Sequence, residues 1–373
     1  MKNIFLIAGR TGGPYFPLPI VANNFPDFKS IYIGVRGGFE DKVCKQKKLS
    51  IKYLPDARLS ILTFKKENII DTVLNYLGLL KNIFLLKWSF LTSLYLLLKF
   101  KPKLIYSTGS FLSVPIIFAA RVTNFLRLTD VKIAIHQQDP LPGISNKLTA
   151  KYAHLLSCVF EYTRVNFSLF EQALVVPNPI NTKLYEVKND VNKIKNSQLK
   201  NILINKSKPK MLIFGGGSGS EDINVWTVKN INSLLKQFQV IHLTGLLQKK
   251  KLEDITDSEY IRMEVLFEEM PAVMQNVDVV LCRAGMASIT ELLYLQKPAF
   301  LVPLPHTHQE ENANQVSAWF KILHQKYRDQ WMEVISTEYP KMFAKIKYPS
   351  TEFIKIEQEK YFQKLRNLLD KSE

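Results

Sequence analysis

Two short apolar runs, each ending in a glycine loop, limit the folds open to this chain more than any other feature. Residues 4–8 lead directly into residues 9–13, which read GRTGG, and residues 211–214 lead into residues 215–220, which read GGGSGS. A buried strand followed at once by a glycine-rich turn is typical of the start of a parallel α/β unit. Two such starts, one in each half of the chain, indicate two α/β domains with parallel sheets.

Further apolar runs repeat this alternation of strands and helical segments. Strands are predicted at residues 30–34, 104–107, 132–136, 174–176, 239–243, 277–282 and 299–302. Segments long enough for helices lie between several of these runs. This order favours parallel strands joined by crossover helices.

A shift in composition sets the predicted domain boundaries. Residues 181–210 are rich in Lys and Asn and hold few large apolar side chains after Tyr185, which predicts a linker or a solvated loop. The predicted domains are therefore residues 1–180 and residues 211–345. Residues 346–373 are predicted to form a C-terminal helix, and the sequence leaves open whether this helix returns to the first domain. A length of 373 residues also exceeds what a single hydrophobic core usually supports.

The chain is strongly basic. Lys and Arg number 50 against 33 Asp and Glu, so the formal net charge is +17. This charge favours an anionic partner, either nucleic acid, acidic lipid or a phosphorylated substrate, although a merely lysine-rich composition accounts for it equally well. No known nucleic-acid motif accompanies the charge, so a nucleic-acid partner is not expected. Cys44, Cys158 and Cys282 lie far apart in the sequence, which indicates neither a disulfide framework nor a zinc site and fits a reduced, cytosolic setting.

Residues 77–100 raise the question of membrane contact. Lys81, Lys87 and Lys99 interrupt this apolar stretch, and its longest uncharged run falls short of the roughly 20 apolar residues that a spanning helix needs. Two interpretations remain open, a buried core helix and an interfacial helix. Trp88 and the flanking lysines suit the boundary of an anionic bilayer.

Polar side chains end one of the predicted strands of the first domain, in the order His136, Gln137, Gln138 and Asp139. The carboxyl end of a strand is where α/β folds place ligand contacts. The alternative is a capped loop in which Asp139 and Asn146 make only local hydrogen bonds. The first glycine loop has neither the GxGxxG spacing nor the GK[ST] ending, so it supports neither a dinucleotide fingerprint nor a P-loop.

Residues 278–292 read DVVLCRAGMASITEL and predict a strand, a loop of small residues and a helix. The loop amides are suited to holding a phosphate, with Arg283 nearby. Glu291, just beyond, is placed either to accept both hydroxyls of a ribose or simply to interact favourably with a helix N-terminus. His306 and His308 lack both the spacing and a third ligand for a metal ion, so no metal site is expected.

Taken in order, these motifs resemble the MurG family of glycosyltransferases. The family patterns GGTGGH, GGYxSxP, HEQNxxxGxxNK and GNPVR resemble residues 9–14, 109–115, 136–147 and 177–181. The patterns GGSQGAxxxN and RAGAxTxxE resemble residues 215–224 and 283–291, and the VPxxH block with its later Gln pair and NA resembles residues 302–315. The blocks occur in family order and run from residue 9 to about residue 315.

The resemblance implies the GT-B architecture, an α/β fold with two Rossmann-like domains whose parallel sheets face a cleft. It implies an inverting, metal-independent hexosyltransferase without a cofactor. The implied reaction moves N-acetylglucosamine from UDP-GlcNAc, held mostly by the second domain, to a lipid-linked muramyl-pentapeptide on the first domain, in peptidoglycan precursor synthesis. The resemblance also implies peripheral attachment to an anionic membrane surface through residues 77–100, on the cytoplasmic face of the bacterial inner membrane.

Matching positions carry the family's site residues over to this chain. The implied donor-binding residues are Thr11, Gly12, Gly13, Asp139, Asn181, Gly217, Ser218, Phe267, Arg283, Met286, Ala287, Ser288, Ile289, Thr290, Glu291, Glu311 and Asn314. The implied acceptor-side residues are Phe111, His136, Gln137, Gln138 and Asn146. Among them, Gly217 stands where the family has a donor-binding serine, and Phe111 stands where it has a tyrosine.

Several polar positions of the family are changed in this chain. Pro14 replaces the loop histidine and Gln137 replaces the glutamate of HEQN, so the family's two best candidates for a catalytic base are missing. Asp139, which replaces the asparagine of that motif, is the nearby carboxylate in these blocks and is the predicted substitute base. Asn181 replaces an arginine and Glu311 brings a negative charge, so weaker binding of an anionic donor is expected.

These changes leave other classes of function open. A non-catalytic protein on the same fold would bind the lipid-linked precursor or a UDP-sugar without transferring the sugar. A GT-B transferase with another lipid acceptor is a further hypothesis. An active transferase predicts UDP release from UDP-GlcNAc, which a binding protein would not show.

Overall fold

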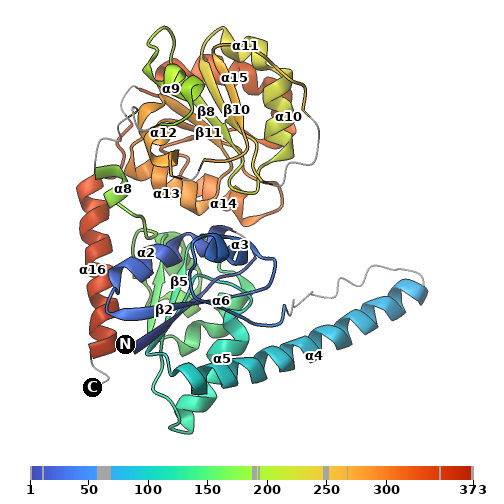
Figure 1. Cartoon of the computed structure of the whole chain (residues 1–373), viewed down its shortest axis with the longest axis vertical. Helices are drawn as coiled ribbons and strands as arrows, with labels where there is room; N and C mark the ends of the chain where they lie inside the picture. The colour runs from blue at the N-terminus through green and yellow to red at the C-terminus, as the bar shows by residue number, and fades with distance from the viewer. Residues whose placement is uncertain are drawn as a thin grey trace. The chain divides into compact units, whose positions relative to one another are not determined.

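The computed structural model describes residues 2–10, 12–56, 69–186, 191, 194–246, 252–266, 268–343 and 346–370. The chain divides into two compact units (Figure 1). Unit 1 comprises Met1–Pro179 and Gln358–Glu373, and unit 2 comprises Ile180–Glu357. Each unit is an α/β structure built on a parallel sheet, as the alternation of strands and helices in the sequence predicted.

Unit 1 is built on a seven-stranded sheet in the order β3-β2-β1-β4-β5-β6-β7, with every neighbouring pair parallel. Its strands are β1 (Lys2–Ile7), β2 (Phe28–Gly34), β3 (Ile51–Tyr53), β4 (Leu104–Ser107), β5 (Lys132–Gln137), β6 (Leu155–Cys158) and β7 (Leu174–Val175). Its helices are α1 (Gly12–Tyr15), α2 (Pro17–Asn24), α3 (Phe39–Gln46), α4 (Ile69–Phe100), α5 (Ser113–Phe125), α6 (Ile144–Thr149) and α7 (Glu161–Asn166). The strand order reverses between β1 and β4, which is the Rossmann-like arrangement.

The side chains of β1 alternate between two hydrophobic cores, one on each face of the sheet. Ile4 and Leu6 belong to the core that includes residues of α2 and α3. Phe5 and Ile7 belong to the core that includes residues of α4 and α5. A central parallel strand is buried on both faces, which explains why the first strand reads as an uninterrupted apolar run.

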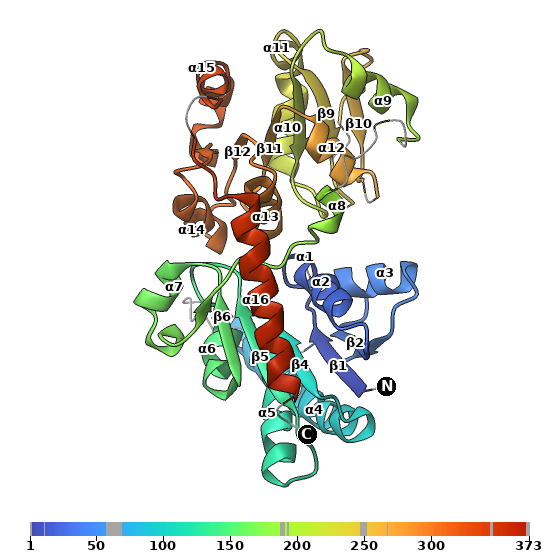
Figure 2. The ribbon, with the colours of Figure 1, turned by 90° about the vertical axis from the view of Figure 1, so that its left-hand side faces the viewer.

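Helix α16 (Thr351–Asp370) brings the end of the chain into unit 1. Its residues from Gln358 onward belong to this unit, and Figure 2 shows this half of the helix beside β5. The side chains that it buries in the core with β1 and β4 are Tyr361, Phe362, Leu365 and Leu369. From Gln358 onward, the C-terminal helix is therefore a structural part of the first unit, a point that the sequence had left open.

Unit 2 is built on a six-stranded sheet in the order β10-β9-β8-β11-β12-β13, again with parallel neighbours. Its strands are β8 (Lys210–Phe214), β9 (Gln239–Leu243), β10 (Tyr260–Met263), β11 (Val279–Cys282), β12 (Ala299–Leu301) and β13 (Lys321–Ile322). Its helices are α8 (Lys183–Glu186), α9 (Ser197–Ile204), α10 (Glu221–Lys229), α11 (Ile231–Leu235), α12 (Met270–Asn276), α13 (Met286–Tyr294), α14 (His308–Gln315) and α15 (Trp331–Glu338).

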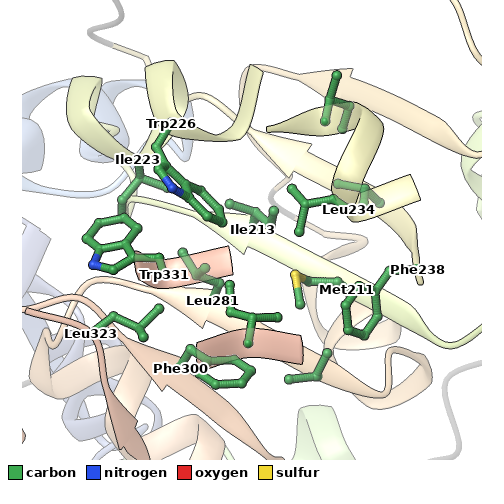
Figure 3. Close-up of a cluster of buried hydrophobic side chains, with 14 of the residues drawn as sticks. Met211, Ile213, Ile223, Trp226, Leu234, Phe238, Leu281, Phe300, Leu323 and Trp331 are labelled. Atoms are coloured by element: carbon green, nitrogen blue, oxygen red, sulfur yellow. The ribbon is translucent and has the colours of Figure 1, made fainter. Parts of the chain in front are cut away.

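Two tryptophans anchor helices to the sheet of unit 2. Trp226 of α10 and Trp331 of α15 have ring centroids 5.3 Å apart, and both pack with Ile213 and Leu281 of the central strands (Figure 3). Such large buried rings contribute much apolar contact area. This packing holds the beginning of α10, and with it the glycine loop that precedes the helix, in a fixed place.

The predicted linker over residues 181–210 is wrong for its second half. Helix α9 begins there, with the side chain of Asn196 accepting a 2.9 Å hydrogen bond from the amide of Leu199. Leu199, Ile202 and Leu203 are buried. Their i, i+3, i+4 spacing forms one apolar face among polar residues, so the Lys- and Asn-rich composition concealed an amphipathic helix that belongs to unit 2.

We predict that replacing Leu365 with alanine destabilises unit 1 by about 2 kcal/mol or more, because the change leaves a cavity in its core. Hydrogen exchange of the central strands β1 and β4 is the readout, since these amides exchange only when the whole unit opens. Their exchange is expected to accelerate by about thirtyfold or more.

Lys364→Ala, on the exposed side of the same helix, is the matched control and is expected to change the stability by less than about 0.5 kcal/mol. Unchanged exchange in Leu365→Ala would contradict the assignment of α16 to the core of unit 1.

Candidate active site

The loops that follow the strands of unit 1 meet at one edge of its sheet, because the strands are parallel. The loop after β1 is tied to the loop after β4, since Thr108 Oγ1 donates a 2.7 Å hydrogen bond to the carbonyl of Pro14. Gln138, after β5, donates a 3.3 Å bond to the carbonyl of Gly13. The structure thus brings together three segments in which the sequence predicted donor-binding or acceptor-side residues.

Close packing at two glycines holds these loops together. A Cβ atom on Gly9 would overlap the side chain of Ser110. Gly109 has a φ of +100°, and a Cβ there would lie 3.0 Å from the amide nitrogen of Asn146. Ser145 Oγ also donates a 3.1 Å bond to the carbonyl of Gly109. The absence of side chains at these two positions is therefore a condition for the observed packing.

Gln137, which stands in the place of the family's glutamate, is buried and used in local bonding. Its Nε2 donates to the carbonyls of Asp139 at 2.7 Å and Leu141 at 3.3 Å. Its Oε1 accepts a 2.6 Å bond from Nδ2 of Asn146. An ionised carboxylate has no hydrogen to donate, so these bonds require the amide. Gln137 therefore shapes the loop and cannot serve as a base.

Two buried amide oxygens at this edge receive no hydrogen bond from any residue that the structure describes. Gln138 and Asn146 are 5% and 1% exposed, and their Oε1 and Oδ1 atoms accept no hydrogen bond within the described part of the chain. Their nitrogens donate to Gly13 and Gln137, which fixes the direction in which each amide faces. Since a buried oxygen without a donor is costly, these are the atoms to which a bound hydroxyl or amide group is suited to donate.

His136 lies in the interior of unit 1. Its Nδ1 is 2.9 Å from Ser157 Oγ and its Nε2 is 3.3 Å from Asn178 Oδ1. Burial lowers the pKa of His136 to about 4, against a smaller opposing effect of the Asn178 hydrogen bond, so the ring is neutral at physiological pH. The hydroxyl oxygens of Ser157 and Tyr361 are also 3.1 Å apart. His136 is thus part of a chain of contacts from β5 through β6 to α16, and its acceptor-side role stays a prediction.

Phe111 and Asp139 are half-buried at the same edge of the sheet. Asp139 directly follows Gln138, and its carbonyl is held by Gln137. Its side chain keeps partial access to solvent, which a group that exchanges protons with a substrate requires. Its role as the base stays a prediction.

In unit 2 the glycine loop after β8 packs directly against the loop after β9. Gly219 has a φ of +89°, and a Cβ there would overlap the carbonyl oxygen of Thr244. Gly245, with a φ of +86°, lies equally close on the other side. The amide of Leu246 donates a 3.1 Å bond to the carbonyl of Gly217. The two loops pack closely together, and Gly217 and the exposed Ser218 lie in the first of them.

A buried polar network connects these two loops to the sheet. Asn224 Nδ2 donates a 2.9 Å bond to the carbonyl of Thr244, and Asn224 Oδ1 is 3.0 Å from Nε2 of His242. The other ring nitrogen of His242 is 3.0 Å from the hydroxyl of Tyr260. Burial, with a smaller effect of Arg262, lowers the pKa of His242 to about 3, so the ring stays neutral. The sequence did not predict His242 and Tyr260 as functional, because no motif surrounds either residue: His242 lies inside the strand β9, and Tyr260 begins the short strand β10.

Glu291 is half-buried in α13, where Oε1 accepts a 2.9 Å hydrogen bond from the hydroxyl of Tyr185. Burial raises the pKa of Glu291 to about 7, and the hydrogen bond from Tyr185 opposes that rise. The sequence analysis named Glu291 but missed Tyr185. The two residues are 106 positions apart, and no spacing in the sequence connects them.

Arg283 contacts the segment that follows β12 and the first turn of α10. Its guanidinium lies 3.3 Å from the carbonyl of Val302 and 3.4 Å from the carbonyl of Pro303. Asp222, in the first turn of α10, is 3.4 Å from the same guanidinium and pairs with Arg328 at 3.8 Å. Burial lowers the pKa of Arg283, with Asp222 opposing that shift. The structure thus commits this side chain to protein contacts, and its part in donor binding stays a prediction.

The N-terminus of α13 offers backbone rather than side chains. Met286, Ile289 and Thr290 are buried, and Thr290 Oγ1 donates a 2.6 Å bond to the carbonyl of Met286. Ala287 and Ser288 are half-buried. The first turn contains no acidic residue, and its amides have no partner within the helix. This end of α13 is therefore suited to an anion.

The remaining candidate residues lie in or beside short helices. Glu311 accepts bonds from Gln315 at 2.8 Å and from the exposed Asn314 at 3.4 Å, both on α14. Asn181 is half-buried just before α8. Gly12 and Gly13 begin α1. Thr11 and Phe267 lie outside the described residues.

Within the residues that the structure describes, no group of three or more His, Cys, Asp and Glu side chains is arranged to hold a metal ion.

Comparison with known proteins defines the class. The model of the glycosyltransferase family 28 N-terminal domain matches residues 4–156, and that of the family 28 C-terminal domain matches residues 210–366. The crystal structure of Acinetobacter baumannii MurG aligns with all of this chain with a TM-score of 0.66 and 18% identity. A UDP co-structure of Staphylococcus aureus MnaA covers 99% of this chain and 97% of its own, with a TM-score of 0.63 and 13% identity. The protein therefore has the GT-B fold of a two-domain glycosyltransferase.

Sequence relatives define the family within this class. A Clostridium kluyveri protein is 30% identical over 82% of this chain and 79% of its own length, and a Staphylococcus aureus protein is 33% identical over 77% and 75%. Both are named UDP-N-acetylglucosamine–N-acetylmuramyl-(pentapeptide) pyrophosphoryl-undecaprenol N-acetylglucosamine transferase. The chain belongs to this family, the MurG glycosyltransferases, as the sequence motifs indicated.

We predict that Gly219→Ala destabilises unit 2 by more than about 2 kcal/mol, because it adds an overlap with the carbonyl of Thr244 to the strain of a positive φ. Gly216→Ala is the matched control, since Gly216 has a similar φ of +88° but open space around it. The control carries only the backbone strain, about 1 kcal/mol.

Urea unfolding followed by tryptophan fluorescence measures both variants, because Trp226 and Trp331 report on this unit. Equal destabilisation by the two substitutions would contradict the close contact between the loops.

Proposed function

We propose that the protein is an active transferase that moves N-acetylglucosamine from UDP-N-acetylglucosamine to a lipid-linked N-acetylmuramyl-pentapeptide. The observation that carries this proposal is that the similarity to relatives with this named activity extends over 82% of the chain, and so through both units. The geometry of each unit supports it separately. Unit 2 offers groups for a nucleoside diphosphate, and unit 1 offers an edge with buried polar atoms for an acceptor.

On the donor side, Glu291 and the N-terminus of α13 are the groups best suited to a nucleoside diphosphate. An ionised Glu291 accepts hydrogen bonds from ribose hydroxyls, as carboxylates do in dinucleotide folds. The free amides of α13 interact favourably with the diphosphate. Helix α10 is less suited to this task because Glu221 and Asp222 occupy its first turn.

The reaction forms a bond between an acceptor hydroxyl oxygen and the anomeric carbon of the sugar. The bond from that carbon to the diphosphate breaks, and its electron pair leaves with UDP. The configuration inverts when the oxygen attacks from the face opposite the diphosphate. The hydroxyl proton passes to a base, for which we propose Asp139, because Gln137 and Pro14 cannot take a proton.

We predict that Asp139→Asn lowers kcat for transfer by about 100-fold or more, because loss of a general base typically costs this much. Calorimetry is expected to show that the variant still binds UDP-N-acetylglucosamine, which places the main loss in the transfer step. The matched control is Asp130→Asn, since Asp130 is an exposed carboxylate of the same unit that pairs with Lys132. Full activity of Asp139→Asn would remove this residue from the mechanism.

A protein that binds the same ligands without transferring the sugar is the second candidate function. The observation that favours it is the bonding of Gln137, since an amide has replaced the family's carboxylate and is built into the loop. Donor binding without acceptor-dependent release of UDP would support this candidate over the transferase.

We further propose that α4 attaches the protein peripherally to an anionic membrane, on the cytoplasmic face of the bacterial inner membrane. The residues on its exposed face are Phe84, Trp88, Leu91, Tyr95 and Leu98, and they are between 41% and 65% exposed. Their spacing places them along one side of the helix. Lys81, Lys87 and Lys99 are exposed around them, which adds attraction to acidic lipids.

The opposite face of α4 packs on unit 1. Ser89, Ser93, Leu96 and Leu97 are buried, and α4 runs beside α5 (Figure 1). By length and composition alone, Lys81–Phe100 is long and apolar enough to cross a membrane. The sequence, judged by its longest uncharged run, had predicted a stretch too short to span one. A helix with one face packed on its own domain and the other apolar and bordered by lysines is better suited to lie in the interface.

We predict that Phe84→Glu reduces sedimentation of the protein with vesicles of anionic phospholipid by about tenfold, because it places a charge on the apolar face. Phe353→Glu is the matched control, since Phe353 is a similarly exposed phenylalanine on α16, and this variant is expected to bind as the wild type does. Equal losses in both variants would contradict a specific role of α4.

A further inference from the structure

The contact between Tyr185 and Glu291 joins two segments of unit 2 that are 106 residues apart in the sequence. The hydroxyl of Tyr185 donates a 2.9 Å hydrogen bond to Oε1 of Glu291. Within the described part of the chain, the Glu291 carboxylate accepts no other hydrogen bond. A carboxylate has about four acceptor positions on its two oxygens, so capacity remains at Oε2 for a ligand.

Tyr185 is itself held firmly at both its backbone and its ring. Gln275 Nε2 donates a 2.8 Å bond to the carbonyl of Tyr185. The ring lies 5.8 Å from the ring of Tyr294 and packs on a cluster that includes Ile180 and Ile354. A side chain fixed in this way loses little further freedom when it donates a hydrogen bond, so it directs the carboxylate effectively.

We propose that Tyr185 is a positioning residue for the nucleoside of the donor. Its hydroxyl holds one oxygen of Glu291, and this contact turns the other oxygen toward the ribose hydroxyls and favours the ionised form that accepts their hydrogen bonds. The inference rests on the proposed function, since it assigns to Glu291 the ribose of the UDP-sugar. It adds a residue outside the family motifs that were matched in the sequence.

The surroundings of Glu291 make this role measurable through pH. Burial raises the pKa of the carboxyl to about 7, and the Tyr185 hydrogen bond works against that rise. The titratable groups that face Glu291 are Tyr185 from α8 and Cys282 from β11. Burial raises the pKa of both far above neutrality, with smaller effects of Glu291 itself, so both remain neutral while Glu291 titrates.

The test is the affinity for UDP-N-acetylglucosamine, measured by calorimetry between pH 5.5 and 9 on the full chain without acceptor. Each phosphate of this donor is linked on both sides, by one ester and one anhydride bond, so neither phosphate loses a proton in this range. The wild-type protein is expected to bind more weakly as the pH falls through about 7, because the protonated carboxyl accepts poorly.

In Tyr185→Phe the midpoint of this profile is expected to move upward by about one pH unit, the size of one hydrogen bond to a charged group. At pH 7 the dissociation constant therefore rises by about fivefold, and the two proteins converge toward pH 9. Tyr348→Phe is the matched control, since Tyr348 is a part-buried tyrosine of the same unit whose hydroxyl donates to the carbonyl of Trp319. Its profile is expected to match the wild type.

A double-mutant cycle separates positioning from a general loss of structure. In a Glu291→Gln background, Tyr185→Phe is expected to leave the pH profile unchanged, because the titrating group is gone. A loss of affinity in Tyr185→Phe that is equal at all pH values, or that persists in the Glu291→Gln background, overturns the inference. A wild-type protein that does not bind the donor at any pH overturns the proposed function and the inference together.

Discussion

The close contact between two backbone segments of unit 2 is the constraint on which the donor side depends. Gly219 and Gly245 meet with no room for a side chain, and both have a positive φ. This contact places the glycine loop against the end of β9, and the Asn224–His242 network supports it from within the sheet. In a parallel sheet every such loop emerges at the same edge, so one rigid loop sets the geometry of its neighbours.

The acceptor side follows the same principle with different chemistry. The loops after β1, β4 and β5 are joined by hydrogen bonds from Thr108 and Gln138 to backbone carbonyls. The family's glutamate has become an amide that donates to two carbonyls, and the loop is built around that change. Gln137 is therefore committed to the loop, and under the proposed function the base is another group, for which Asp139 is the proposal.

The sequence predicted the α/β class, the two parallel sheets and most long strands, because their apolar runs are uninterrupted. It missed β3, β6, β10 and β13, whose sequences, IKY, LLSC, YIRM and KI, are short and partly polar. It also treated α9 as part of a linker, since three spaced apolar side chains are easily hidden among Lys and Asn. The sequence could not predict which side chains far apart along the chain contact one another.

Individual site residues show the same limit. Glu291 was named from its position after a strand and a small-residue loop, but its partner Tyr185 lies in a segment without a motif. The role of Arg283 near a phosphate stays a prediction, and its guanidinium contacts two backbone carbonyls and Asp222, which no motif indicated. A motif identifies the residue type at a site, and only the packing around it decides where the side chain points.

The most direct test of this account is UDP release by the purified full chain, supplied with UDP-N-acetylglucosamine and a short-chain lipid-linked muramyl-pentapeptide. The account predicts that UDP is released only when the acceptor is present, and that the sugar appears on the acceptor with inverted configuration. Donor binding in a calorimeter without any acceptor-dependent release would contradict the assignment of transferase activity.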